Sequence, residues 1–394
     1  MSGAELLCTW LPAVPFALTL LNVATWPRGR PDPARRPRVS VLIPARNEER
    51  NIERCVRAAL TTGYALHEVI VYDDQSTDST SHILEALQRE APALRVVRGD
   101  LLPAGWVGKA HACHRLVQLA SGDVLLFVDA DTELQPGGVA RILSLLYPRR
   151  GSGADVVSAV PRQRMQSFGE RLLVPLLHLT YTSWLPLLLV QHSRDPRFVA
   201  ANGQLLAIRH EVAVLLGGFS AVASEIVDDV AFCRHAKVRG AKVVFADGFR
   251  VARCRMYRSF REVWSGFSKN LYEGLGSRPL RLGAVMALYL GAFVAPYVVL
   301  ALALLLPGWA ALAPAAAFGV ALNLALRALL ALRFRQPLEG VLLHPLGVLA
   351  LCGVALNSYR CTRRGALAWA GRTYAQRTER LARRTAGSLT AGTR

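Results

Sequence analysis

The chain is poor in acidic residues and lacks two common nucleotide-binding signatures. Its 394 residues include 28 Asp and Glu against 47 Lys and Arg, which gives a formal net charge of +19. No Gly-x-Gly-x-x-Gly follows the first predicted strand, and Gly-x-x-x-x-Gly-Lys-Ser/Thr does not occur. The first absence argues against a nicotinamide-cofactor domain, and the second excludes a P-loop.

The chain also lacks paired cysteines. Its seven cysteines show no paired spacing, and their odd number argues against a disulfide framework. His111, Cys113 and His114 lie close together in the sequence but lack the second pair of ligands that a zinc site needs. We therefore expect reduced thiols and no zinc.

The excess of basic residues lies beside long apolar runs. One group of arginines spans Arg28 to Arg38, and a second spans Arg360 to Arg384. This placement favours contact with anionic lipid headgroups and a positive-inside topology over binding of nucleic acid. No internal repeat accompanies the apolar runs, which argues against a transporter.

The first apolar run, Leu6 to Trp26, contains 21 uncharged or apolar residues and matches the thickness of the hydrocarbon core. It has no basic n-region and no Ala-x-Ala cleavage site, so we expect a retained anchor. The arginines that follow predict that the next part of the chain is cytoplasmic.

Short β-branched runs then alternate with amphipathic windows up to about residue 248. The expected strands are Val39–Ile43, Glu68–Tyr72, Leu94–Val97, Val124–Val128 and Val156–Val160. The expected helices are Glu49–Leu60, Ser79–Arg89, Lys109–Leu119 and Gly137–Leu146. This alternation predicts an α/β fold with a mostly parallel sheet, in which ligands bind at the carboxyl ends of the strands.

Four later apolar stretches extend the membrane-associated part. Leu172–Val190 contains two prolines and several polar residues, and we expect an interfacial or re-entrant helix there. Gly283–Leu306 and Ala310–Leu332 are expected to form a hairpin of spans. Gly340–Asn357 is short, so it is either re-entrant or an exception to the positive-inside rule, and we favour a cytoplasmic tail.

One of these stretches carries polar residues. Asn323 and Arg327 lie four residues apart inside Ala310–Leu332. They fit either a polar pathway or an arginine that extends to the nearby membrane surface, and the second alternative is favoured.

Polar residues follow several of the expected strands. Pro44, Arg46 and Glu48 follow the first strand, and Asp73-Asp74 ends the second. Carboxylates at such positions can bind a base or ribose, although Asx turns and helix caps use the same residues.

A second acidic motif follows the fourth strand. Asp129 and Asp131 are alternate residues of an extended segment, so their carboxylates can converge on Mg²⁺ or Mn²⁺. Gly105-Trp-Val-Gly108-Lys109 precedes a helix and offers a cation for phosphate, although a simple loop with a helix cap also fits.

Further candidates occur in the second half of this region. Gly203 and Gln204 precede an acidic pair, Asp228-Asp229, which opens a helical window as a general base or as stabilisers of the helix dipole. Arg255, Tyr257 and Lys269 lie before the first C-terminal apolar run, where they fit acceptor binding or membrane-interface anchoring.

Together these motifs resemble the family 2 glycosyltransferases of the GT-A fold, a Rossmann-like fold, over residues 38–275. The resemblance rests on Val39-Ser-Val-Leu-Ile-Pro-Ala-Arg-Asn-Glu48, Asp73-Asp74-x-Ser-x-Asp-x-Thr, Asp129-Ala-Asp131 and Asp228-Asp229, in that order. Within the family, Gly105-Trp-x-Gly-Lys109, Arg255-Met-Tyr257 and Trp369-Ala-Gly-Arg-Thr-Tyr374 are similar to carotenoid- and hopanoid-associated members.

The resemblance implies a role for each matching residue. Asp74, with Pro44, Arg46 and Glu48, would bind the nucleoside of a nucleotide-sugar, with a UDP-sugar favoured. Lys109 and Asp129 would lie near the donor, and Asp131 with Asp129 would bind Mg²⁺ or Mn²⁺. Asp229 would be the catalytic base with Asp228 beside it. The acceptor side would contain Gly203, Gln204, Arg255, Tyr257 and Lys269.

The chain departs from the processive members of the family. Those members carry Gln-x-x-Arg-Trp where this sequence has Gly266-Phe-Ser-Lys269-Asn270. The resemblance therefore implies the transfer of a single sugar, with inversion, to a hydroxyl of a lipophilic acceptor such as a carotenoid or another isoprenoid. The alternatives are a polyprenyl-phosphate sugar transferase and a non-catalytic membrane scaffold.

The expected organisation has four parts. They are an anchor with a basic linker over 1–37, the GT-A domain over 38–275, transmembrane helices over 276–360 and a basic tail over 361–394. We expect a multi-pass protein of the cell membrane, with a cytoplasmic catalytic domain and no nucleic-acid partner.

Overall fold

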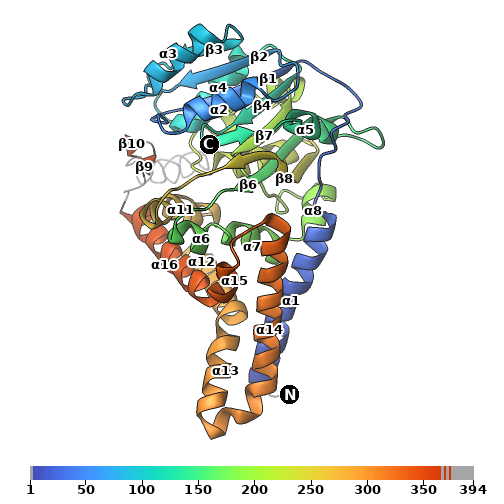
Figure 1. Ribbon diagram of the computed structural model, residues 1–394, viewed down its shortest axis with the longest axis vertical. Coiled ribbons are helices and arrows are strands. Elements are labelled where there is room, and N and C mark those ends of the chain that lie inside the picture. Colours follow the sequence, from blue (N-terminus) through green and yellow to red (C-terminus); the bar gives the residue numbers. More distant parts are fainter. Residues whose placement is uncertain (1–2, 365–367, 370–371, 374–394) are drawn as a thin grey trace, which may run out of the picture.

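The computed structural model describes residues 3–364, 368–369 and 372–373 (Figure 1). An α/β part contains the large sheet, and helices from both ends of the chain form a second part beneath it in this view. Two short strands, β9 (Ala368–Trp369) and β10 (Arg372–Thr373), pair antiparallel. The rest of the predicted tail motif and of the basic tail lies outside the described residues.

The predicted strands and helices of the α/β part are confirmed. The sheet contains β1 (Val39–Ala45), β2 (Glu68–Asp73), β3 (Leu94–Arg98), β4 (Val124–Val128), β5 (Thr132–Leu134), β6 (Val156–Gln163), β7 (Leu205–Arg209) and β8 (Val243–Cys254). The helices are α2 (Ile52–Leu60), α3 (Thr80–Glu90), α4 (Gly108–Leu119), α5 (Gly138–Leu146), α9 (His210–Leu215), η1 (Ser220–Val222) and α10 (Asp228–Val238). In α2 the buried residues follow helical spacing, at Ile52, Cys55, Val56 and Ala59. This spacing explains why the helix could be predicted from the sequence.

The order of the strands determines where the functional loops meet. In the sheet the order is β3-β2-β1-β4-β7-β6-β8-β5. The pairs among β3, β2, β1 and β4 are parallel, as is the pair β6 and β8, whereas β7 is antiparallel to β4 and β6 and β5 is antiparallel to β8. Val128 at the end of β4 pairs with Leu205 at the start of β7, so the loop that enters β7 lies at the carboxyl end of β4.

Helices cover both faces of the sheet. Ile52 of α2, Leu84 of α3 and Val139 of α5 belong to one buried cluster. Leu116 of α4 and Phe232 of α10 belong to another cluster on the opposite face. Because both faces are buried, the central strands are almost continuously apolar.

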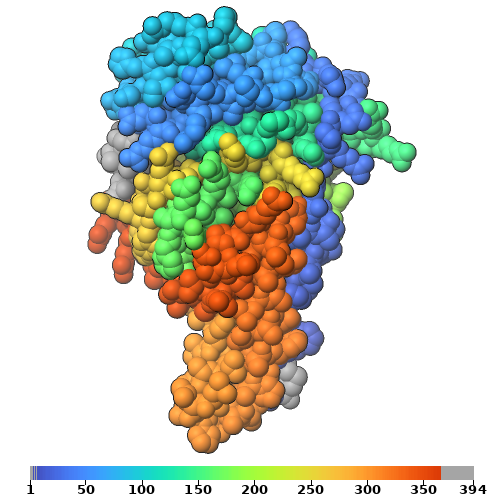
Figure 2. Space-filling model, viewed as in Figure 1, coloured from blue at the N-terminus to red at the C-terminus, as the bar shows by residue number. Residues whose placement is uncertain are grey.

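The second part is helical and contains segments from distant parts of the sequence. It contains α1 (Gly3–Thr25), α6 (Phe168–Leu173), α7 (Leu176–Ser183), α8 (Leu187–His192), α11 (Phe260–Gly274), α12 (Pro279–Phe293), α13 (Ala295–Leu305), η2 (Pro307–Leu312), α14 (Ala313–Phe334), α15 (Glu339–Leu342) and α16 (His344–Arg363). Figure 2 shows that this part narrows to a stalk, where α13 and α14 lie. Gly319 allows α14 to approach α1 closely, because a Cβ there would lie 2.3 Å from the carbonyl oxygen of Cys8.

The segment 172–190 differs from the expected interfacial helix. Its helices α6, α7 and α8 are separated at Pro175 and Pro186, and Leu173, Leu179 and Leu187 are buried. Asn22 of α1 serves the break between α7 and α8: its Nδ2 donates to the carbonyl oxygens of Thr182 and Leu185, each at 2.8 Å. The segment is therefore an internal support between α1 and the sheet, because proline interrupts a single helix and the broken ends need buried partners.

Two helical stretches of the described chain are long and apolar enough to cross a membrane, Leu7–Thr25 and Pro307–Phe334. The helices α12 and α13 are bent by 46° and make a third if the bent pair counts as one span. The predicted extension of Arg327 to the membrane surface is wrong: this side chain is buried among the helices, with 1% of its surface exposed. The α14 helix packs against α1, α13 and α7 around it, which leaves no path to the surface.

An ion-pair junction connects the two parts. Asp247 of β8 is buried and pairs with Arg333 of α14 and, at 3.4 Å, with Arg28 of the basic linker. The backbone N–H of Asp247 donates to the carbonyl oxygen of Pro27 at 2.8 Å. One carboxylate of the sheet thus holds both the end of α14 and the chain that leaves α1.

Candidate active site

The loops after β1 and β2 lock together and hold the predicted donor residues. The backbone N–H of Asp74 donates to the carbonyl oxygen of Ala45 at 2.8 Å, and the guanidinium of Arg46 donates to the carbonyl oxygens of Asp74 and Gln75. Asn47 and Gln75 adopt left-handed conformations, with φ of 55° and 56°. The two adjacent parallel strands therefore bring Pro44, Arg46 and Asp74 to one edge of the sheet, as predicted.

Glu48 lies at the inner end of the same loop. Its backbone N–H donates to Oγ1 of Thr80 at 2.8 Å, and Nδ2 of Asn51 donates to its carboxylate at 2.9 Å. Burial, and then the charge of Asp131, raise the pKa of Glu48 to about 7. The carboxyl group of Glu48 therefore lies close enough to the Asp129-Ala-Asp131 motif to be affected by the charge of its carboxylates.

The acidic motif after β4 faces a lysine at the start of α4. Nζ of Lys109 lies 2.7 Å from the carboxylate of Asp129. Oγ1 of Thr132 donates to Asp131 at 3.1 Å, and burial, followed by the charge of Asp129, raises the pKa of Asp131 to about 6. Lys109 and Asp129, both predicted to lie near the donor, are thus in direct contact.

Asp129 and Asp131 fit a divalent cation bound largely through its substrate. Among the described residues, no group of three or more His, Cys, Asp and Glu side chains could hold a metal by itself. Mg²⁺ commonly binds one or two carboxylates and takes its remaining ligands from phosphates and water. The closeness of the two carboxylates, which contributes to the raised pKa of Asp131, is the electrostatic setting that such a cation relieves.

Gly203 separates the lysine from the second acidic pair. A Cβ at this position would lie 3.1 Å from Nζ of Lys109 and 3.4 Å from Oδ2 of Asp229. The antiparallel pairing of β7 with β4 places Gly203 here, directly before Leu205. Lys109 and Asp229, which are far apart in the sequence, therefore both lie close to one glycine.

Asp228 and Asp229 open α10 and lie in its first turn. The backbone N–H of Val230 donates to Oδ1 of Asp229 at 2.8 Å, which satisfies a donor of the first helical turn. Burial raises the pKa of Asp228 to about 6 despite the cation of Lys109, and it also raises the pKa of Asp229. A carboxyl with a raised pKa is a better proton acceptor when it is ionised.

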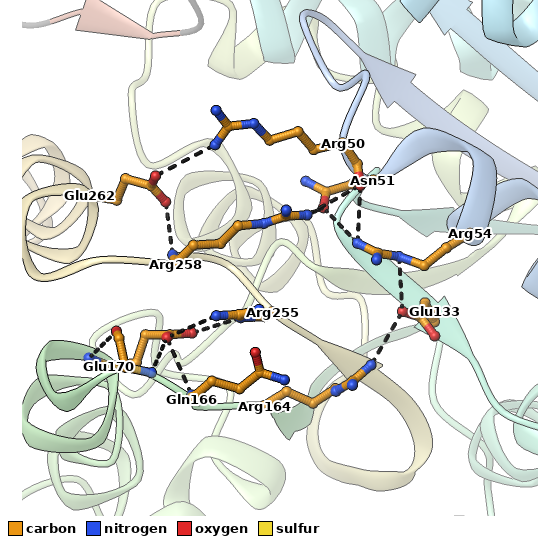
Figure 3. Close-up of polar contacts among 11 residues, drawn as sticks. Arg50, Asn51, Arg54, Glu133, Arg164, Gln166, Glu170, Arg255, Arg258 and Glu262 are labelled. Atoms are coloured by element: carbon orange, nitrogen blue, oxygen red, sulfur yellow. Dashed lines mark hydrogen bonds and ion pairs between the residues drawn. The ribbon is translucent and has the colours of Figure 1, made fainter.

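The predicted acceptor-side residues do not all have the same surroundings. Tyr257 lies near the acidic motif, because burial and then the charge of Asp131 raise the pKa of its hydroxyl. Lys269 of α11 also faces this region: burial, followed by the charge of Lys109, lowers its pKa to about 8. Arg255 instead forms a two-point ion pair with Glu170 of α6, at 2.9 and 3.1 Å (Figure 3).

The connector from β8 to α11 is fastened to the donor side. Arg258 donates to Oδ1 of Asn51 at 2.9 Å and, through its backbone N–H, to Glu262 at 2.8 Å (Figure 3). Asn51 in turn contacts Glu48. The connector that carries Tyr257 is thus joined to the loop that carries Glu48.

Two contributors were not identified from the sequence. Cys254, at the end of β8, accepts a hydrogen bond from Nε2 of Gln204 at 2.9 Å and interacts with Asp131. Tyr181 of α7 interacts with Asn202 and lies in the field of Asp229. The available signal was the polar run Thr180-Tyr-Thr-Ser183 inside an apolar stretch, since buried hydroxyl groups need partners.

Comparisons with known proteins agree with this geometry. Residues 37–270 match the sequence model of the family described as "Glycosyltransferase like family 2". A 4,4'-diaponeurosporenoate glycosyltransferase of Staphylococcus aureus is 26% identical over 267 residues, which cover 68% of this chain and 69% of the relative.

The first of two similar solved structures shows the same fold. A mannosyltransferase from Pyrobaculum calidifontis, in complex with GDP-Man and Mn²⁺, aligns with a TM-score of 0.53 at 22% identity, over 90% of this chain and 98% of that one. Glucosyl-3-phosphoglycerate synthase from Mycobacterium tuberculosis, with Mn²⁺ and UDP-glucose, aligns with a TM-score of 0.41 at 19% identity, over 66% of this chain and 81% of that one. Because the family match covers well over half of the chain and includes every acidic motif of the site, the protein belongs to the family 2 glycosyltransferases.

Proposed function

We propose that the protein is an inverting, metal-dependent enzyme that transfers one sugar from a nucleotide-sugar to a hydroxyl of a lipophilic acceptor, a carotenoid or another isoprenoid. The observation that carries this proposal is the position of Gly203 between Lys109 and Asp229. It places a cation and a carboxylate close to one backbone position beside the donor motif. A sugar held between them has both groups within reach.

The donor half of the proposal rests on the locked loops. Asp74, Pro44, Arg46 and Glu48 would bind the nucleoside, with a UDP-sugar favoured, and Lys109 would counter the charge of the diphosphate. Asp129 and Asp131 would hold Mg²⁺ or Mn²⁺, which acts as a Lewis acid toward the departing diphosphate. The two solved structures named above contain Mn²⁺ together with a nucleotide-sugar.

The acceptor half rests on Asp229. Its carboxylate would accept the proton of the acceptor hydroxyl as the oxygen attacks the anomeric carbon from the face opposite the diphosphate. Gly203 and Gln204 would form the floor of this side, with Tyr257 and Lys269 oriented towards it. Holding both substrates in line can contribute about 7–11 kcal/mol at best.

The membrane-associated part supports an acceptor that is dissolved in the lipid bilayer. Leu7–Thr25 and Pro307–Phe334 are candidate spans, and the arginines after α1 favour a cytoplasmic position for the α/β part. The helices beneath the sheet contact the site directly, since Tyr181 of α7 lies in the field of Asp229. The S. aureus relative, by its name, glycosylates a carotenoid derivative.

The test is sugar transfer by the detergent-solubilised full-length chain. Labelled UDP-, GDP- and dTDP-sugars would be offered with membrane lipid extract as the acceptor, with and without Mn²⁺. We expect metal-dependent label in the lipid phase for one donor, abolished by Asp229→Asn and retained by Asp32→Asn, whose side chain is 63% exposed. An absence of both transfer and nucleotide-sugar binding with every donor would refute the proposal and leave a scaffold.

One observation favours a second acceptor class. The name of the S. aureus relative denotes a carboxylate, "diaponeurosporenoate", and an ionised carboxylate or phosphate needs no general base. For such an acceptor, including a polyprenyl phosphate, transfer by Asp229→Asn would stay within a few-fold of the wild-type rate. The same panel of measurements therefore separates a hydroxyl acceptor from an anionic one.

A further inference from the structure

Arg327 of α14 is a buried cation without a counter-ion. Its side chain is 1% exposed, and its one hydrogen bond within the described chain is a long one, from Nη1 to Oε1 of Gln336 at 3.4 Å. No carboxylate of the described residues lies within ion-pair distance, and Nε has no partner among them. A buried charge left unpaired is strongly unfavourable, and more so in a helix that is apolar enough to span a membrane.

A second buried cation, Lys237 of α10, shows that this chain is able to provide partners for such a group. Nζ of Lys237 donates to the carbonyl oxygens of Val190, Ser193 and Phe198, at 2.6, 3.1 and 2.6 Å. Three acceptors thus surround one ammonium group, whereas Arg327 has a single distant one. The deficit at Arg327 is therefore a property of that place and not of the fold as a whole.

The groups around Arg327 are donors or neutral. Arg327 interacts electrostatically with Tyr297 of α13, His344 of α16 and His178 of α7. In the part of the chain that the structure describes, the hydroxyl of Tyr297 and both ring nitrogens of His344 are buried without a hydrogen-bond partner. Burial, followed by Arg327 and Arg333, lowers the pKa of His178 to about 3, so that ring is neutral and supplies no compensating charge.

This set of groups matches an oxyanion. A guanidinium with a free Nε, a phenol and an imidazole offer several buried N–H and O–H donors from three helices, and a planar guanidinium can pair with two oxygens of a phosphate. No acidic side chain of the described residues competes for the position. The cluster therefore lacks the one component, a negative oxygen, that would satisfy all of its members.

The outer faces of the helices around Arg327 indicate the route by which an anion would reach it. Large apolar side chains are exposed on the outer faces of the same helices, at Leu304 and Leu305 of α13, Phe318 and Leu332 of α14, and Leu346 of α16. A surface of this kind faces hydrocarbon. The break between α12 and α13, bent by 46°, lies three residues before Tyr297, so Tyr297 lies in the first turn of α13 next to an interruption of the helical packing.

We propose that Arg327, together with Tyr297 and His344, binds the phosphate of an anionic membrane phospholipid between α13, α14 and α16. The proposal uses none of the donor or acceptor residues described above, and it does not depend on the identity of the sugar or of the acceptor. The lipid phosphate supplies the missing counter-ion. The bound lipid holds α13 and α16 against α14.

The test measures the melting temperature of the delipidated full-length protein in a neutral detergent. Phosphatidylglycerol, phosphatidylcholine with the same acyl chains, and inorganic phosphate would be titrated separately into the wild type, Arg327→Met and Arg335→Met. Arg335 is an exposed arginine one residue beyond α14, so it controls for attraction to any surface arginine. We expect a saturable rise with phosphatidylglycerol in the wild type and in Arg335→Met only, and no comparable rise with the other two additives.

The outcomes are distinct. An equal response of Arg327→Met overturns the proposal, and an equal effect of inorganic phosphate overturns a lipid source. If Arg327→Met does not fold, Arg327→Lys keeps the charge but loses the paired donors, and the phosphatidylglycerol concentration at half effect should rise by about thirtyfold or more. An unchanged half-effect concentration in Arg327→Lys, together with unchanged lipid phosphorus in the purified protein, would also overturn it.

Discussion

At the scale of single residues, the site depends on one position that has no side chain. Gly203 lies beside Lys109 and Asp229. A Cβ at this position would lie 3.1 Å from Nζ of Lys109 and 3.4 Å from Oδ2 of Asp229. Both groups carry charge and are held by other contacts, Lys109 by Asp129 and Asp229 by Val230. The absence of a side chain at Gly203 therefore keeps Lys109 and Asp229 free of a close contact, and the backbone conformation does not itself require glycine there.

The first prediction concerns this space. Gly203→Ala should lower kcat/KM by about tenfold to a hundredfold, because a displacement near 1 Å at the reacting groups has effects of this size. The melting temperature should change little. Gly274→Ala, where a Cβ would meet nothing within 4 Å, is the matched control. Full activity of Gly203→Ala would show that the substrates do not pass between Lys109 and Asp229.

The second prediction uses the lowered pKa of Lys269. Burial and Lys109 lower it to about 8, so the ammonium is charged at pH 7 and loses its proton as the pH rises through 8. If this cation orients the acceptor, kcat/KM should fall over the same interval. Lys269→Arg should keep its charge and flatten that fall, since a guanidinium stays protonated. Rates measured from pH 6.5 to 9.5 decide the matter, and an identical fall in Lys269→Arg would exclude Lys269 as its origin.

The residues that the sequence revealed are those placed by local rules. Asp74, Asp129 and Asp131 follow hydrophobic strands, and the parallel order of those strands guarantees a shared edge. The pairing of Arg255 with Glu170, 85 positions apart, had no such signal, because both residue types are also common on surfaces. Long-range side-chain partners depend on tertiary packing, which the local hydrophobic periodicity of the sequence does not reveal.

At the scale of elements, α6 shows how one short helix is stabilised at its start. Ser167 and Glu170 form a capping box, and Glu170 also accepts two hydrogen bonds from Arg255. Glu170 is buried, which raises the pKa of its carboxyl, but the hydrogen bonds from Arg255 and Ser167 outweigh that and lower it to about 2. The helix is thereby fixed to the connector that leads to α11.

The third prediction follows from this lowered pKa. A glutamate in the unfolded chain has a pKa of about 4.3, so the stabilisation by Glu170 is complete above that pH and is lost as the pH falls towards 2. Its size is about 2–3 kcal/mol. Glu170→Gln should lower the free energy of unfolding by that amount at pH 7, and the difference from the wild type should shrink below pH 4. Thermal unfolding from pH 7 to pH 3 measures it, and a difference that stays constant with pH would contradict the assignment.

The helices and strands of the α/β part could be predicted from the sequence because each one has its own hydrophobic periodicity. Strand β4 matches its predicted bounds, whereas the largest shifts, three residues, occur at the start of α2 and the end of β6. The segment 172–190 was misjudged because a hydrophobic run has the same composition in a surface helix and in a buried one. Its prolines gave the breaks, but its burial depends on α1 and Asn22, which lie far away in the sequence.

At the scale of the whole molecule, Asp247 is one of the polar residues that hold the α/β part and the helical part together. It pairs with Arg28 and Arg333 from opposite ends of the chain, and its side chain is 4% exposed. A buried carboxylate in that position orients the sheet relative to α14. It also fixes the point where the basic linker leaves α1.

The fourth prediction tests this junction. Asp247→Ala leaves two arginines without their shared partner and should destabilise the protein by about 3–5 kcal/mol. Trypsin should then cut the linker between Arg28 and Arg38 faster, as the linker is no longer held to β8. Asp32→Ala, which removes an exposed pair with Arg149, is the control and should change cleavage little. Equal cleavage of the wild type and Asp247→Ala would show that the pair does not hold the linker.

The close packing of α1 against α14 has a consequence for biosynthesis. About 290 residues separate the end of α1 from the start of α14, so at about 5–20 residues per second the ribosome needs about 15–60 s to supply the partner of the first helix. The loops that carry the proposed donor residues, the last of which is Asp131, emerge much earlier. We therefore expect a nascent chain that is able to bind its donor while the first helix still waits for α14, and the acceptor side would be the last part of the enzyme to mature.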